Sequence, residues 1–160
     1  MKIKYRTYLY VMKELSFLKD FYDKILNTGK DRRFNYKIFC IGYNKTGTTS
    51  IISALKLLGI KASHWPRLGV EPKIGWVRYF KESKITAFSD GPLFQNSLYK
   101  KLYKSFPDSK YILTTRDTKS WRSSVMKFFK DSPWEITDQE SLDEKVLEYH
   151  QYNDEVRSFF

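Results

Sequence analysis

The sequence predicts an α/β fold: a P-loop NTPase-like three-layer sandwich in which helices cover both faces of a parallel sheet. Short apolar runs of strand length alternate with helical stretches from residue 36 onward, a pattern typical of about four parallel strands. The first run leads into a glycine- and threonine-rich turn that opens a helix. The chain has 160 residues, 41% hydrophobic and 18% aromatic, which is enough apolar surface for a packed core.

The first 35 residues differ from the rest. Apolar side chains recur there at three- and four-residue steps, as on one face of an amphipathic helix over residues 5–28. They are Tyr8, Val11, Leu15, Leu18, Tyr22 and Ile25. A glycine at 29 ends this pattern, and a charged link follows. We therefore expect an N-terminal extension over residues 1–35 and a main domain over residues 36–160.

Within the main domain, apolar runs and turn residues define the expected elements. Strands are expected over residues 37–42, 60–64, 85–88 and 111–115. Helices are expected over residues 48–58, 94–105, 121–130 and 142–159. Residues 65–83 are expected to form a loop with a short helix.

Composition narrows the function classes. Basic residues outnumber acidic ones by 29 to 18, for a net charge of +11, but they are spread along the chain without a nucleic-acid-binding motif. We expect no nucleic-acid partner and a preference for small, multiply anionic ligands. No apolar run approaches the ~20 residues of a membrane span. The single cysteine, Cys40, excludes a disulfide framework and favours a reducing, cytoplasmic location.

The most informative segment is the turn after the first strand, residues 42–50. Gly42 and Gly47 have the spacing of the Walker A loop, whose backbone N–H groups hold phosphates. The lysine position of that loop is Thr48 here, and the only lysine is Lys45, inside the turn. The pattern predicts a phosphate-binding loop without the lysine that an ATPase has at this position. A loop serving another nucleotide enzyme, such as a kinase, stays open as an alternative.

Residues 45–49 (Lys-Thr-Gly-Thr-Thr) resemble the 5′-phosphosulfate loop of sulfotransferases that use 3′-phosphoadenosine 5′-phosphosulfate (PAPS). A second motif of that family, a strand-end arginine with a serine eight residues later, is matched by Arg116 and Ser124. The resemblance covers about residues 36–160 and is closest to a branch of short enzymes whose loop reads Asn-Lys-Thr-Gly-Thr-Thr-Ser. It implies sulfuryl transfer from PAPS to a hydroxyl or amine acceptor, without a metal.

The resemblance also implies roles for individual residues. Lys45 would neutralise charge on the bond that breaks, and Arg116 with Ser124 would hold the 3′-phosphate. The 5′-phosphate would be held by the loop, namely Lys45, Thr46, Gly47, Thr48, Thr49 and Ser50. A structural arginine paired with Asp117 is the alternative for Arg116.

The base is less clearly marked. Asp90, followed two residues later by a proline, takes the place of the catalytic histidine of cytosolic members. A turn-forming Asp-Gly-Pro sequence is the alternative for Asp90. His64, at the end of the second expected strand, is the competing base, although a lone histidine beside Trp65 is often a packing residue.

Two departures from the family pattern bear on activity. Ser50 stands where cytosolic members carry a tryptophan that stacks on adenine, and the chain ends where members usually add a strand and a loop. We expect a small-molecule or glycan acceptor. A homo-oligomer that completes the site, and an inactive nucleotide-binding protein that acts through binding or assembly, both stay open.

Overall fold

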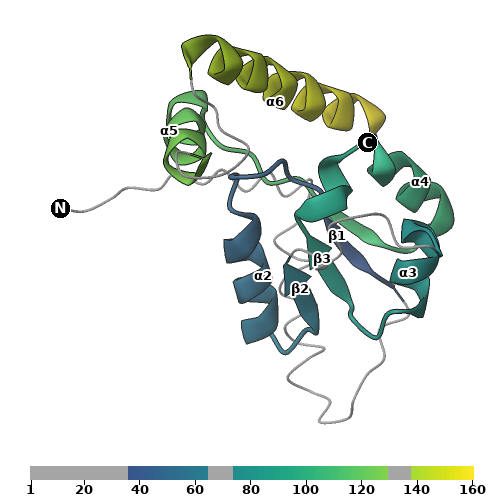
Figure 1. Cartoon of the computed structure of the whole chain (residues 1–160). Coiled ribbons are helices and arrows are strands. Elements are labelled where there is room, and N and C mark those ends of the chain that lie inside the picture. The colour runs from purple at the N-terminus through teal and green to yellow at the C-terminus, as the bar shows by residue number, and fades with distance from the viewer. Residues whose placement is uncertain (1–35, 65–73, 130–137) are drawn as a thin grey trace.

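The computed structural model describes residues 36–64, 74–129 and 138–160 (Figure 1). Its core is a four-stranded sheet of order β2-β3-β1-β4, and all three strand pairs are parallel. The predicted α/β fold with a parallel sheet is therefore confirmed. The helix predicted over residues 5–28 lies outside the described residues.

The strands are short and agree in place with the sequence prediction. They are β1 (Ile38–Cys40), β2 (Ala62–His64), β3 (Ala87–Ser89) and β4 (Lys110–Ile112). The helical elements are α2 (Thr48–Leu57), α3 (Trp76–Glu82), the 3₁₀ turn η1 (Gly91–Phe94), α4 (Leu98–Ser105), α5 (Thr118–Phe129) and α6 (Gln139–Phe159).

One predicted element is divided. The helix expected over residues 94–105 is the turn η1 followed by α4. Asn96 and Ser97 between them have φ angles of 49° and 50°, a left-handed conformation that a right-handed helix cannot contain. Apolar periodicity carries no information on such a break, so the sequence predicted one continuous helix.

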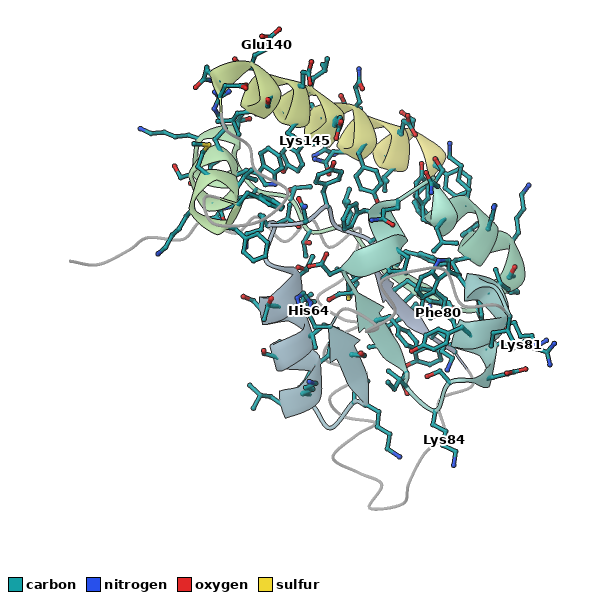
Figure 2. All side chains as sticks on the ribbon, viewed as in Figure 1. His64, Phe80, Lys81, Lys84, Glu140 and Lys145 are labelled. Atoms are coloured by element: carbon teal, nitrogen blue, oxygen red, sulfur yellow. The ribbon has the colours of Figure 1, made fainter. Side chains whose placement is uncertain are left out.

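Each face of the sheet is covered by helices (Figure 1). Ile38 and Cys40 of β1 pack with α2 residues on one face. Phe39 between them packs with residues of α3, α4 and α6 on the other. Figure 2 shows Phe80 between α3 and this second face. The alternation of strand side chains thus builds two cores and leaves the carboxyl ends of the strands for loops.

The C-terminal helix α6 fixes two of these loops. The Tyr152 hydroxyl donates to the carbonyl of Ile41 at 2.5 Å, just after β1. The Tyr149 hydroxyl donates to the Arg116 carbonyl at 2.7 Å and accepts from the Arg116 N–H at 2.8 Å, after β4. The Tyr149 ring also stacks on Trp121 of α5, with centroids 4.6 Å apart. Helix α6 therefore holds the ends of β1 and β4 in a fixed relation.

Candidate functional site

The turn between β1 and α2 is shaped to receive an anion. Lys45 and Gly47 have φ angles of 62° and 99°, so the backbone reverses direction within a few residues. The Ile51 N–H donates to the Gly47 carbonyl at 3.1 Å, while the first N–H groups of α2 before it have no partner within the helix, as at any helix N-terminus. Free N–H groups at such a turn and at a helix N-terminus form an anion-binding nest. The loop therefore fits the phosphate group that the sequence predicts.

The start of the loop is packed tightly against the end of β4. A Cβ atom added at Gly42 would lie 1.9 Å from the Thr114 hydroxyl oxygen, so only glycine fits. The buried Thr46 hydroxyl donates to the Tyr43 carbonyl at 2.6 Å and lies 2.8 Å from the Thr114 hydroxyl. Its side chain therefore fixes the loop against the residues that follow β4.

The Lys45 side chain extends from the loop to α5. Its ammonium sits 3.7 Å from the centre of the Phe128 ring, whose side chain is 59% exposed. Its carbonyl accepts a hydrogen bond of 3.3 Å from the Arg116 guanidinium. Burial lowers the pKa of Lys45; the Asp90 carboxylate opposes this shift, and Arg116 adds to it.

On the β3 side of the loop, Asp90 and His64 lie together. The Thr48 hydroxyl donates to Asp90 Oδ2 at 3.0 Å, and the Gly91 N–H donates to Asp90 Oδ1 at 2.8 Å. His64 Nε2 is 3.5 Å from Asp90 Oδ2 and 3.1 Å from the Thr49 hydroxyl. Figure 2 shows His64 at the end of β2 beside α2. The two residues predicted as competing bases are therefore neighbours in one hydrogen-bonded cluster.

Asp90 has an unusual backbone. Its φ angle is 64°, a left-handed conformation that side-chain-bearing residues seldom adopt. Such conformations persist where the surroundings enforce them, and they concentrate at functional sites. Here the enforcing contacts are the two hydrogen bonds that the Asp90 carboxylate accepts.

On the β4 side, Arg116 follows the last strand and Ser124 lies in α5. Tyr149 holds the Arg116 backbone on both its N–H and its carbonyl. Asp117 caps α5 by accepting from the Ser120 N–H at 2.8 Å, which lowers the pKa of this exposed carboxyl. Ser124 is half-buried and precedes Phe128 by one helical turn, so both share a face of α5.

The structure brings most of the predicted residues to one edge of the sheet. Lys45 is joined to Arg116, Thr48 to Asp90, and Thr49 to His64 by the contacts above. Ser50 is exposed in the first turn of α2. Sequence reasoning missed Ser89 and Thr114, which contact site residues from strand ends. Ser89 directly precedes Asp90 and Thr114 precedes Arg116 by two residues, and this position near the carboxyl ends of parallel strands was the available signal.

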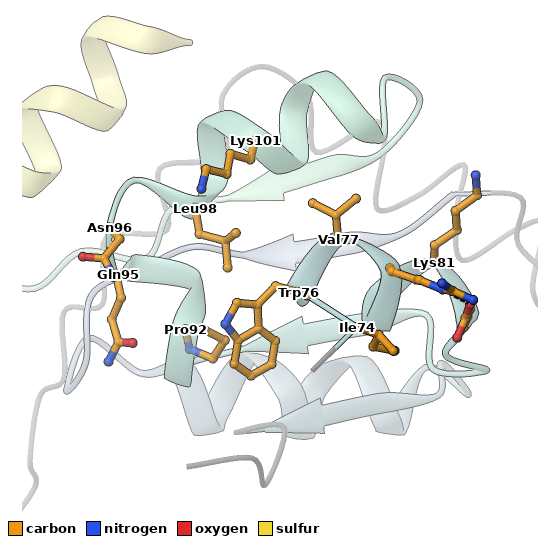
Figure 3. A pocket seen from close by; sticks show the side chains of 12 residues that line it. Ile74, Trp76, Val77, Lys81, Pro92, Gln95, Asn96, Leu98 and Lys101 are labelled. Atoms are coloured by element: carbon orange, nitrogen blue, oxygen red, sulfur yellow. Dashed lines mark hydrogen bonds and ion pairs between the residues drawn. The ribbon is translucent and has the colours of Figure 1, made fainter. Parts of the chain in front are cut away.

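A groove of about 790 Å³ lies on the α3 and α4 face of the sheet (Figure 3). Pro92, two residues after Asp90, lines it together with Trp76 and Leu98. Gln95, Asn96 and Lys101 supply polar groups toward one end and Lys81 toward the other (Figure 3), and Arg78 and Glu82 also line the groove. The groove combines an apolar middle with an excess of positive charge.

Residues 36–64, 74–129 and 138–160 contain no group of three or more histidine, cysteine, aspartate or glutamate side chains placed to hold a metal ion. The helices among these residues include none that is long and apolar enough to cross a membrane.

Comparison with known proteins agrees with this geometry. A family model described as a sulfotransferase domain matches residues 37–159, which include the loop, the ends of β3 and β4, and α6. A search of curated proteins finds no match. Because the family model covers well over half of the chain, the chain belongs to the sulfotransferase family.

Proposed function

We propose that this protein transfers a sulfuryl group from PAPS to a hydroxyl or amine acceptor. One observation carries the proposal: the loop contacts the ends of both neighbouring strands. The Lys45 carbonyl contacts Arg116 after β4, and Thr48 contacts Asp90 after β3. A cation, an anion nest and a candidate base therefore surround one point at the edge of the sheet.

The residues present fit the two phosphates of the donor. The N–H groups of the loop and of the first turn of α2 would hold the 5′-phosphate. Arg116 and Ser124 would hold the 3′-phosphate, since a guanidinium binds phosphate through two parallel hydrogen bonds. When bound, PAPS supplies the activated sulfuryl group. The sulfotransferase family match supports this donor.

Lys45 would supply the electrostatic part of catalysis. Its ammonium would neutralise charge that develops on the bridging oxygen as the sulfur–oxygen bond breaks, because fixed charges aimed at developing charge lower a barrier. To reach that oxygen, the ammonium leaves the Phe128 ring, with which it makes a cation–π contact.

The proton of the acceptor passes to the cluster on the β3 side, where Asp90 and His64 are the two candidate bases. Both lie beside the loop that would hold the donor. Sulfuryl transfer, like phosphoryl transfer, depends mainly on holding nucleophile and donor in line.

The acceptor would enter along the groove, whose lining residue Pro92 follows Asp90 by two positions. Trp76 and Pro92 offer apolar contact in its middle, and Lys101 offers charge at one end. This lining suits a small molecule or glycan with a ring and an anionic group. We place the enzyme in the cytoplasm, which agrees with its single cysteine, Cys40, buried in the sheet.

The test is incubation with PAPS and a panel of phenols, sugars and amines, with release of 3′-phosphoadenosine 5′-phosphate followed by chromatography. We expect release by the native protein without added metal ions. PAPS that stays intact in every mixture, together with tight binding of 3′-phosphoadenosine 5′-phosphate, would favour a protein that binds the nucleotide without catalysis. Turnover of ATP with Mg²⁺ instead would favour a kinase.

A further inference from the structure

The hydrogen bonds around His64 determine which of its ring nitrogens carries the proton. The buried Ser89 hydroxyl lies 3.1 Å from the carbonyl of Thr48. Since a carbonyl only accepts, Ser89 is the donor, and its single hydroxyl proton is used in this bond. His64 Nδ1 lies 3.1 Å from the same hydroxyl oxygen. Nδ1 must therefore be the donor to Ser89, which leaves the lone pair of the neutral ring on Nε2.

The surroundings of Nε2 suit a group that takes up a proton. The Thr49 hydroxyl, on the exposed first turn of α2, is 3.1 Å away and donates to the lone pair. Asp90 Oδ2 is 3.5 Å away, too far for a hydrogen bond, as expected where two acceptors face each other without a proton. A proton added at Nε2 would turn this contact into an ion pair.

Asp90 is less suited to meet the acceptor itself. Both of its oxygens already accept hydrogen bonds, from Thr48 and from the Gly91 N–H. Its side chain is 12% exposed, against 31% for His64. Within the part of the chain that the structure describes, the charged groups that face this cluster are the Asp90 carboxylate after β3 and Lys45 of the loop, which interacts with Asp90 electrostatically.

We propose that Nε2 of His64 is the general base, that Asp90 stabilises the imidazolium that forms, and that Ser89 is a positioning residue that fixes the ring tautomer. The proposal rests on the proposed sulfuryl transfer. The acceptor hydroxyl replaces Thr49 at Nε2 and gives its proton to that nitrogen. Its oxygen forms the new bond to sulfur as the bond to the 5′-phosphate oxygen breaks, and 3′-phosphoadenosine 5′-phosphate leaves. The imidazolium then returns the proton to water.

The most direct test determines the His64 tautomer by ¹⁵N NMR of the imidazole rings. It needs neither PAPS nor a sulfuryl acceptor. The chain has 2 histidines, and His150→Gln removes the signals of the exposed one, which contacts Thr118 instead. We expect neutral His64 to carry its proton on Nδ1, and Ser89→Ala to produce a mixture of tautomers. Circular dichroism checks that this variant is folded. A neutral His64 ring protonated on Nε2 in the native protein would overturn the proposal, whichever molecule supplies the sulfuryl group.

Steady-state kinetics with PAPS distinguishes the two candidate bases, His64 and Asp90, by the loss of rate when each is replaced. His64→Gln should lower kcat by about 10²- to 10⁴-fold, the usual contribution of a positioned base, with little change in KM for PAPS. Asp90→Asn should cost less, because Ser89 still fixes the tautomer. His150→Gln is the matched control and should leave kcat unchanged. A larger loss from Asp90→Asn than from His64→Gln would make Asp90 the base. If native His64 has the expected tautomer but the native protein transfers no sulfuryl group from PAPS, the proposed function is wrong and not the assignment of the tautomer.

Discussion

The two sides of the loop are built differently. On the β3 side, a continuous network of polar contacts joins Thr48, Asp90, His64 and Ser89. On the β4 side, α6 fixes the backbone of Arg116, while Ser124 makes no side-chain hydrogen bond to any described residue and the Phe128 ring is largely exposed.

This difference matches a division of work between reaction and binding. A base must be oriented before the acceptor arrives, because misplacement reduces rate steeply. A side chain that binds phosphate must instead direct its hydrogen-bond donors toward the nucleotide. Under the proposed function, the β3 side would serve as preformed catalytic machinery and the β4 side as a nucleotide-binding surface.

Among variants of the loop and the β4 side, the largest effect is expected from Lys45, which lies where the two sides meet. Lys45→Ala should lower kcat by about 10²- to 10³-fold, the range found for removal of one group that stabilises developing charge. Affinity for 3′-phosphoadenosine 5′-phosphate should fall much less, since the loop N–H groups remain. Lys56→Ala, in the last turn of α2, is the control for loss of charge. Equal losses in rate and affinity would mean that Lys45 serves binding alone.

Arg116 tests the β4 side by itself. Arg116→Ala should weaken binding of 3′-phosphoadenosine 5′-phosphate by about 10- to 100-fold, because hydrogen bonds to charged groups contribute about 1.5–3 kcal/mol. It should also remove the preference for that nucleotide over ADP, as measured by calorimetry. Arg122→Ala, which breaks an ion pair with Asp143 on the same part of the surface, serves as control. If affinity for both nucleotides falls equally, Arg116 does not hold the 3′-phosphate.

Gly42 tests how strongly the loop depends on its packing against β4. Gly42→Ala places a methyl group against the Thr114 hydroxyl and carbonyl. Overpacking of this kind destabilises a fold by about 1–3 kcal/mol, which urea unfolding would measure. Ser53→Ala, on the exposed side of α2, should change little. Unaltered stability of Gly42→Ala would show that the junction is looser than its geometry indicates.

The smallest effect is expected at Phe128. Phe128→Ala releases the Lys45 ammonium from a cation–π contact that is worth about 0.5–1 kcal/mol at an exposed site. Affinity for 3′-phosphoadenosine 5′-phosphate should rise about 2- to 5-fold by calorimetry. Met126→Ala, also exposed on α5, is the matched control. A fall in affinity would instead show that the ring contacts the bound nucleotide.

Local pattern was enough to predict the fold. Alternating apolar runs marked the four strands of the sheet, and Gly47 marked the tight turn after β1. The break between η1 and α4 was not predictable, because it depends on left-handed backbone at Asn96 and Ser97.

The candidate site could be predicted residue by residue but not as an arrangement. Lys45, Asp90, His64 and Arg116 were identified separately by motif and position. Their contacts required the sheet order, which places β1 between β3 and β4. The position of Ser89 against His64 has no sequence signature, since 25 residues separate them along the chain. Only the parallel pairing of β2 with β3 brings them together.

The central claim is that the loop, Arg116 and Ser124 hold a nucleotide with phosphates at both the 3′ and 5′ positions. The direct measurement is calorimetric titration of the native protein with 3′-phosphoadenosine 5′-phosphate, ADP, and ATP with Mg²⁺. We expect 3′-phosphoadenosine 5′-phosphate to bind tightly without a metal ion, and with higher affinity than ADP. Preference for ATP with Mg²⁺, or no binding of 3′-phosphoadenosine 5′-phosphate, would contradict it.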